Sequence, residues 1–170
     1  MDLLEHASPQ ARLYVTVLLR GFQARGQLAI LGMLQTFLND EQKDAFSLHG
    51  VTLYGLEPGN PARSMQLDGL FVRKTACQVI AFDTMLPHEQ TGLLPRTERL
   101  AVYTSHYCIQ GDFHMGSDAL LAEFIAGARA QFVGASNVQV FPLFHPQAEM
   151  IQAAPLAFLH RDAVLMHHLV

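Results

Sequence analysis

The sequence predicts a mainly β fold with short helices, of the α+β class, built from two tandem ββα-β-β repeats. The first observation is an internal repeat, in which residues 17–76 reappear as 102–163 at a shift of 85 to 87 positions. The second is a period-two alternation of apolar residues in several segments, which is typical of strands. We expect the repeats to form two small barrels or one pseudo-twofold β body.

The repeat keeps its register over most of the chain. Upstream blocks match at a shift of 85 and downstream blocks at 86 or 87, so the second copy has two additional residues after Gly111. Small length differences of this kind occur in loops. The best-matched block places apolar residues on one stripe of a helix. Its members are Met33, Leu34, Phe37 and Leu38 in the first copy and Leu120, Leu121, Phe124 and Ile125 in the second.

Each repeat opens with a predicted β-hairpin. Leu13 to Leu19 alternate at period two and include several β-branched side chains. Gly21 breaks this strand, and Phe22 to Ile30 forms the returning strand. The second copy repeats the pattern at Leu100 to Ser105 and Tyr107 to Met115. Each hairpin can therefore present one apolar face to a core.

A short helix follows each hairpin. In the second copy Ser117 can cap a helix from Asp118 to Ala126, and Gly127 suits its end. In the first copy the helix is expected at Leu34 to Leu38. Further strands then complete each copy. They are predicted at Ala45 to Leu56 and Phe71 to Phe82, and at Ala130 to Leu143 and Leu156 to Leu169.

The predicted organisation is a first β repeat at residues 1–86, a linker at 87–96 and a second β repeat at 97–170. The linker is bounded by prolines, which favour loops. A unit as small as one repeat buries little more than about 60% of its unfolded surface. Because 50% of the residues are apolar and 15% are charged, we expect the two copies to share a core or a broad apolar interface.

Charge and hydropathy exclude several classes of protein. The formal net charge is −4 and the basic residues are scattered, so nucleic acid is not an expected partner. Met1 to Glu5 lack the features of a signal peptide, and no apolar stretch reaches the roughly 18 residues that span a bilayer. We therefore expect a cytoplasmic protein with no membrane contact. In that compartment the two cysteines, Cys77 and Cys108, should be free thiols.

Metal binding is the first chemistry to consider, because the chain has nine histidines. His106 and Cys108 share one strand face, and His114 follows, so these three are the only candidate ligands. No His-Glu-x-x-His or paired Cys-x-x-Cys motif is present. The matching positions of the first copy are Gly21, Gln23 and Ala29. We therefore expect no metal and no cofactor, and interpret the histidines as ordinary strand and loop residues.

Catalytic motifs are missing as well. The Gly-x-Ser-x-Gly elbow and the glycine-rich phosphate loops do not occur. Cys108 with His106 as its base is a poor pair, because residues two apart on a strand do not make the close contact required. Asp40, Glu41 and Asp44 have no acidic counterparts in the second copy, so we interpret them as a solvated helix end. No catalytic or cofactor-binding residue is assigned.

Most aromatic residues recur in both copies, and such matched residues are expected in the core. The pairs are Phe37 and Phe124, Phe46 and Phe132, Tyr54 and Phe141, and Phe71 and Phe158. Tyr103, Phe113 and Phe144 have no match. They are freer to contact a partner or a subunit interface.

The hairpin residues 102–104 and 107–115, the short helix, Phe132 and residues 138–140 resemble a bacterial family of uncharacterised small β domains. The first copy looks like a diverged second example. This resemblance implies no known activity and transfers no catalytic residue. The pattern is also similar to Sm-like and SH3-like small barrels. RNA binding is not expected from that similarity, because the stretch after Gly26 lacks the Asp and Asn recognition pair and no Arg-Gly pair opens the last strand.

These observations favour a non-enzymatic tandem-repeat β protein that binds a protein partner or associates with itself as a homo-oligomer. The duplicated framework and the lack of repeated chemistry are the grounds for this hypothesis. The alternative is a small-molecule or metal-binding protein with its site at the junction of the repeats, where pockets often form. Its support is the enrichment of histidines in the second copy.

Overall fold

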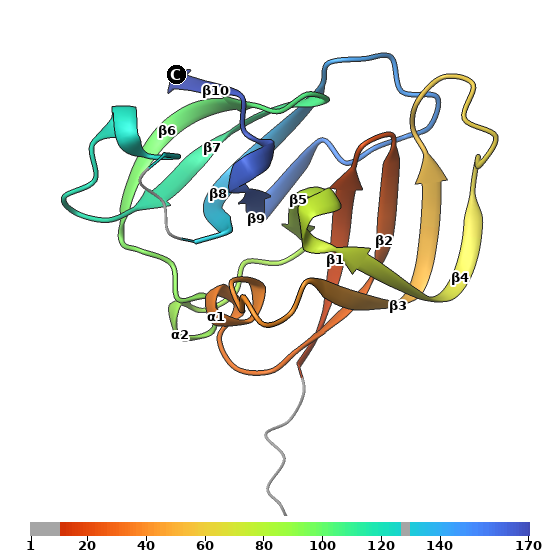
Figure 1. Cartoon of the computed structure of the whole chain (residues 1–170), viewed down its shortest axis with the longest axis horizontal. Coiled ribbons are helices and arrows are strands. Elements are labelled where there is room, and N and C mark those ends of the chain that lie inside the picture. Colours follow the sequence, from red (N-terminus) through yellow and green to blue (C-terminus); the bar gives the residue numbers. More distant parts are fainter. Residues whose placement is uncertain (1–10, 127–129) are drawn as a thin grey trace, which may run out of the picture.

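The protein folds as one open antiparallel sheet of ten strands with a few short helical turns (Figure 1). The computed structural model describes residues 11–126 and 130–170. The first repeat contributes β1 (Ala11–Leu19), β2 (Phe22–Ile30), β3 (Ala45–Gly55), β4 (Met65–Arg73) and β5 (Cys77–Phe82). The second contributes β6 (Arg96–Tyr103), β7 (Tyr107–Met115), β8 (Phe132–Pro142), β9 (Ala153–His160) and β10 (Met166–Leu169). The mainly β prediction is confirmed, but the described residues form no closed barrel.

The two repeats have the same strand order. The first runs β5-β1-β2-β3-β4 across the sheet and the second β10-β6-β7-β8-β9. Strands β9 and β5 pair with each other and join the two halves, with Ile80 opposite Phe158. The internal repeat read from the sequence is therefore a repeat of topology.

Two apolar cores lie against the joined strands, and each contains residues from both repeats. Side chains alternate along a strand, so the central pair of strands faces both cores. In β5, Val79 belongs to the core dominated by the second repeat, whereas Ile80 belongs to the core dominated by the first. In β9, Leu159 and Phe158 divide in the same way. Neither core is complete without the other repeat.

The two long strands predicted at the ends of the repeats are each broken into two. Residues 71–82 contain the 3₁₀ turn η1 (Lys74–Ala76), and residues 156–169 contain η3 (Arg161–Ala163). At η1 the buried Lys74 donates from Nζ to the carbonyl oxygen of Asp40, 2.7 Å away. This contact with a residue distant in sequence accompanies the break, and strand propensity does not reveal it.

The helix predicted at residues 118–126 is wrong. Only a single 3₁₀ turn, η2 (Leu121–Glu123), forms there, and its N-cap is Leu120 rather than Ser117. Isolated helices of this length are unstable unless they pack, and this one lacks a side-chain cap. Gly127, the expected end of the helix, lies outside the described residues, as do Met1 to Glu5.

The remaining helical segments are short. Helix α1 (Leu34–Leu38) has the predicted bounds. Helix α2 (His88–Thr91) occupies the segment predicted as a linker and ends at Gly92, whose φ of 69° favours glycine. Across residues 11–126 and 130–170, no helix is both long enough and apolar enough to cross a membrane.

Several predictions about single residues can now be compared with the structure. Both cysteines are free thiols, as predicted, and both are buried. Among the matched aromatics, Phe71 and Phe141 are exposed rather than in the core. Phe113, expected to be free for a partner, is fully buried against Phe124. The other matched aromatic residues are buried or half-buried, whereas the matched apolar residues Met33 and Leu120 are exposed.

Candidate functional site

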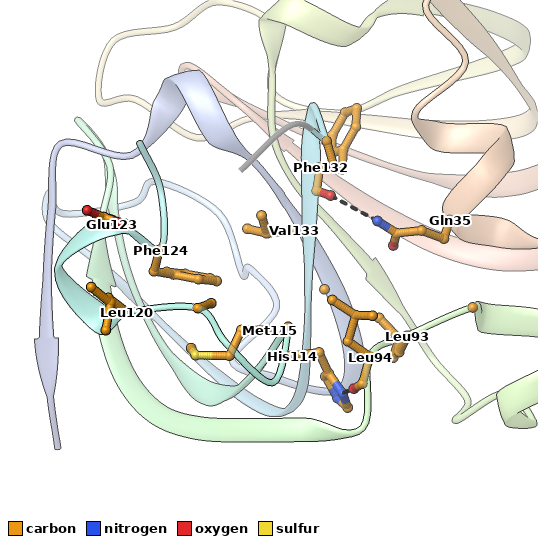
Figure 2. Close-up of a pocket in the computed structure, with 15 residues that line it drawn as sticks. Gln35, Leu93, Leu94, His114, Met115, Leu120, Glu123, Phe124, Phe132 and Val133 are labelled. Atoms are coloured by element: carbon orange, nitrogen blue, oxygen red, sulfur yellow. Dashed lines mark hydrogen bonds between the residues drawn. The ribbon is translucent and has the colours of Figure 1, made fainter. Parts of the chain in front are cut away.

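A cavity of about 470 Å³ lies at the junction of the repeats (Figure 2). One wall comes from helix α1 and another from the segment after α2. The remaining walls come from β7, the segment around η2 and β8. Its apolar side chains are those of Leu93, Leu94, Met115, Ala119, Leu120, Phe124, Ala130, Phe132 and Val133. A cavity of this volume accommodates a small organic molecule.

One residue of the cavity lining, Gln35, has a buried polar atom that lacks a partner among the described residues. Gln35 of α1 donates from Nε2 to the carbonyl oxygen of Phe132, 3.4 Å away (Figure 2). Its Oε1 is buried and accepts no hydrogen bond from any described residue. Such an acceptor costs free energy unless a donor reaches it. Glu123, which is exposed, supplies the only charge of the described lining.

His114 lines the cavity but is occupied on both ring nitrogens. Nδ1 lies 2.7 Å from the carbonyl oxygen of Leu94, which can only accept, so this nitrogen carries the proton. Nε2 is then the acceptor for the hydroxyl of Ser136. The ring therefore connects β7 to β8 and to the linker segment, and it has no free nitrogen for a ligand.

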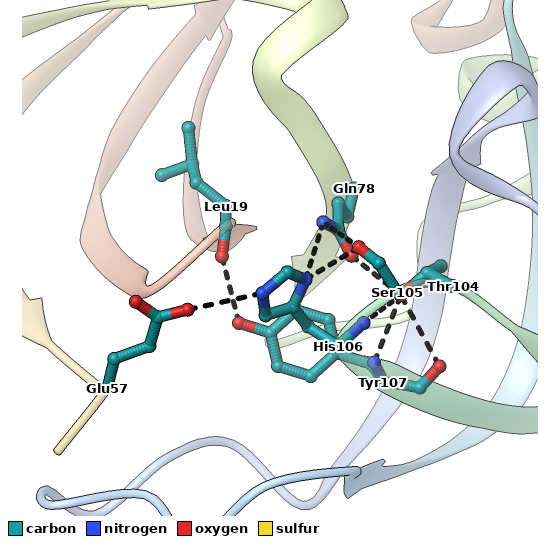
Figure 3. Close-up of polar contacts among 7 residues, drawn as sticks. All are labelled: Leu19, Glu57, Gln78, Thr104, Ser105, His106 and Tyr107. Atoms are coloured by element: carbon teal, nitrogen blue, oxygen red, sulfur yellow. Dashed lines mark hydrogen bonds and ion pairs between the residues drawn. The ribbon is translucent and has the colours of Figure 1, made fainter.

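A second polar cluster fastens the tip of the β6–β7 hairpin to the first repeat (Figure 3). Thr104 Oγ1 donates to Gln78 Oε1 of β5 at 2.6 Å and accepts the backbone N–H of Tyr107. The Tyr107 hydroxyl donates to the carbonyl oxygen of Leu19 at the end of β1. Burial raises the pKa of Tyr107, so this hydroxyl keeps its proton. The first-repeat acceptors of Thr104 and Tyr107 are thus an amide oxygen and a backbone carbonyl oxygen.

His106 completes this cluster. Its Nε2 lies 3.2 Å from Glu57 Oε1 and its Nδ1 lies 2.6 Å from Ser105 Oγ (Figure 3). A carboxylate only accepts, so in the neutral ring Nε2 donates and Nδ1 accepts from the serine hydroxyl. Serine, histidine and glutamate thus form a hydrogen-bonded chain, which is also the order found in hydrolytic triads.

The surroundings of this chain favour a structural interpretation. Ser105 Oγ also accepts the side-chain amide of Gln78 at 3.3 Å, which ties the hydroxyl to β5. None of the three residues of this hydrogen-bonded series lines the cavity of Figure 2. His106 packs edge-on against Phe144, another residue at the junction. We therefore interpret Glu57, Ser105 and His106 as residues that hold the two repeats together.

The three candidate metal ligands are not brought together. His106 precedes β7, while Cys108 and His114 are its second and eighth residues. Strand geometry places Cys108 and His114 on the order of 20 Å apart. Cys108 is hydrogen-bonded to Tyr103, and burial raises the pKa of its thiol. Within the described ranges, no three His, Cys, Asp or Glu residues are grouped as a metal site requires.

The acidic residues after α1 lie in a loop at the end of this helix, where they contact solvent. Glu41 and Asp44 are exposed, and Asp40 is partly exposed and lies 3.9 Å from the ammonium of Lys43. Asp40 also accepts the Lys74 side chain through its backbone carbonyl. These contacts are those of a loop that packs against η1.

Sequence reasoning missed the residues that shape the cavity. Gln35 lies inside the matched helical block, but it is polar and its counterpart Ala122 is not, so the repeat drew no attention to it. Leu93 belongs to the presumed linker, yet it is buried and packs against Gly134, where an added Cβ would lie 2.2 Å from its Cδ2. The contact between Leu93 and Gly134 joins residues far apart in the chain, so the local sequence around either residue does not predict it.

Comparison of the chain with models of protein families, with curated proteins and with solved structures gave no match.

Proposed function

We propose that the protein is a non-enzymatic binding module that holds a small, mainly apolar molecule at the junction of its repeats. The single observation that carries this proposal is the mainly apolar cavity whose lining includes Gln35, a residue with a buried and unpartnered Oε1. The serine, histidine and glutamate of the hydrogen-bonded cluster, Ser105, His106 and Glu57, do not line this cavity. Their separation from the cavity supports binding rather than catalysis there.

The chemistry of the lining indicates the class of ligand. The apolar walls favour a hydrocarbon body, and the side-chain amide of Gln35, whose Oε1 has no donor among the described residues, favours a ligand with a hydroxyl or N–H group. Glu123 at the cavity disfavours an anion by charge repulsion. A neutral alcohol of medium chain length meets these three conditions, whereas a fatty acid anion of the same length does not.

Binding can be tested with 1-octanol and octanoate as probes. We expect 1-octanol to raise the thermal unfolding midpoint of the chain, because a ligand that binds only the folded state stabilises it. Octanoate should do so less. Isothermal titration calorimetry and the shift of the unfolding midpoint measure both. Equal effects of the alcohol and the anion would contradict the role assigned to Glu123.

Two variants locate the site. Gln35→Leu should weaken octanol binding about tenfold, because it removes the acceptor for the hydroxyl. Gln42→Leu, at an exposed position, is the matched control and should leave binding unchanged. Ala119→Phe fills the cavity and should abolish binding. If octanol binds the Ala119→Phe variant as well as the unaltered chain, its site is elsewhere and the proposal fails.

A further inference from the structure

The two outermost strands of the sheet, β4 and β10, are unpaired along one side in the described part of the chain (Figure 1). Among residues 11–126 and 130–170, β4 pairs only with β3, and β10 pairs only with β6. The outer side of each strand presents backbone N–H and C=O groups that another strand can bind. The sheet therefore ends in two sites for strand addition.

These two edges correspond to the two strands that are joined in the middle of the sheet. At the repeat shift of 87, β4 corresponds to β9 and β10 corresponds to the last four residues of β5. The central joint pairs β9 with β5 over four residues, and β10 is four residues long. The chain thus contains one example of the joint that its two free edges can make with another copy.

Large apolar side chains occur at both free edges, as they do in the central joint, but here they lie in solvent. Phe71 of β4 is 84% exposed, whereas its counterpart Phe158 in β9 is 0% exposed. Met166 of β10 is 61% exposed, whereas its counterpart Val79 in β5 is 0% exposed. Large exposed apolar side chains along an unpaired strand are characteristic of an interface. Pairing of β4 with β10 would cover both residues.

The register of the central joint can be transferred to the free edges. The pairs Val79–Leu159, Ile80–Phe158, Ala81–Ala157 and Phe82–Leu156 become Met166–Val72, His167–Phe71, His168–Leu70 and Leu169–Gly69. In this register Phe71 of one copy meets His167 of the next. The His167 ring already lies 5.9 Å from Phe124, so Phe71 would extend the apolar core of the second repeat.

We propose that copies of this chain associate head to tail, with β4 of one copy adding to β10 of the next. The partner is a second copy, because the counterparts of both edges are already complementary within the chain. Such a heterologous interface leaves one β4 and one β10 free, so it continues until a ring closes or a filament forms. This proposal is independent of the small-molecule cavity, whose lining includes neither β4 nor β10.

Two variants with one blocked edge each test the arrangement. Phe71→Glu and Met166→Glu place a charge where the joint would bury it, at positions that are exposed within one chain. We expect each variant to be monomeric in sedimentation velocity at concentrations where the unaltered chain is assembled. Leu31→Glu, at an exposed apolar residue away from both edges, is the control and should assemble normally. Unchanged thermal unfolding and octanol binding of the variants verify that the fold is intact.

Mixing the two variants decides the direction of assembly. Phe71→Glu retains a functional β10, and Met166→Glu retains a functional β4, so an equimolar mixture should form a dimer and nothing larger. A Met166→Glu variant that dimerises alone would indicate symmetric pairing of β4 with β4 and would overturn the proposal. A mixture that stays monomeric would overturn it too, as would an unaltered chain that is monomeric at every concentration tested.

Discussion

The segments that follow the first hairpin of each repeat share an apolar stripe but fold differently. In the first repeat the stripe forms helix α1, in which Leu34 and Leu38 are fully buried. In the second it forms only the turn η2, and the corresponding Leu121 and Ile125 are half-buried. The connection from the hairpin is residues 31–33 in one repeat and 116–120 in the other. The second repeat, whose connection is two residues longer, has a wall of the cavity where the first repeat has a packed helix.

This difference shows how a duplicated framework can acquire a site in one copy alone. The strands of both repeats pair in the same order, so the sheet tolerates the change. Helix α1 of the first repeat contributes to the cavity in the second repeat, since Gln35 lines the cavity and its side-chain amide donates to the carbonyl oxygen of Phe132. The cavity thus depends on a well-packed segment in one repeat and a loosely packed segment in the other.

The largest expected effect comes from truncating the matched leucines of the two stripes. Leu34→Ala should lower the free energy of unfolding by about 2–5 kcal/mol, because it leaves a void in a packed core. Leu121→Ala should cost about 1 kcal/mol, since that side chain is already partly in solvent. Urea unfolding followed by far-ultraviolet circular dichroism measures both. Equal losses would show that the two segments are packed alike.

A smaller effect is expected at the residues that end the two stripes. Asn39 donates from Nδ2 to the carbonyl oxygen of Gln35 and accepts the backbone N–H of Phe132 at 2.8 Å. Asn39→Ala should therefore lower the free energy of unfolding by about 1–3 kcal/mol. Its counterpart Ala126 is exposed, and Ala126→Asn should change stability by less than about 0.5 kcal/mol. A destabilised Ala126→Asn variant would contradict the difference between the repeats.

The smallest effect concerns the matched residues that precede the turns η1 and η3. Burial lowers the pKa of His160 below its ordinary value of 6.5, whereas the matching Arg73 is exposed. Since the folded state favours the neutral ring, this contribution to stability is full above pH 6.5. It is lost as the pH falls through the lowered pKa of the folded state.

The variant His160→Asn tests this pH dependence. Asparagine retains an acceptor for the Asp162 N–H that His160 Nδ1 now binds, but it does not titrate. We expect its free energy of unfolding to fall less than that of the unaltered chain between pH 7 and pH 5. If the free energy of unfolding falls equally with pH in the two proteins, groups other than His160 cause the loss of stability in acid.

The fold was more predictable than the site. Period-two patterns identified β2 and β7 with their observed bounds, and the repeat placed α1 correctly, because hairpins and apolar stripes are local features. The breaks at Lys74 and Arg161 were missed, since strand-like residues stand on both sides of each three-residue turn and were interpreted as one strand. The cavity was missed because Gln35, Leu93 and Phe132 meet only through the sheet.

The sequence by itself determined that the protein is mainly β, that it is a tandem repeat and that its cysteines are free. These properties follow from local patterns and from counterparts at a constant spacing. The tertiary structure decided that the repeats form one open sheet, that the strands β9 and β5 join them, and that Phe71 lies in solvent. The physical reason is that strand pairing connects residues far apart in the chain, and a strand pattern does not specify its partner.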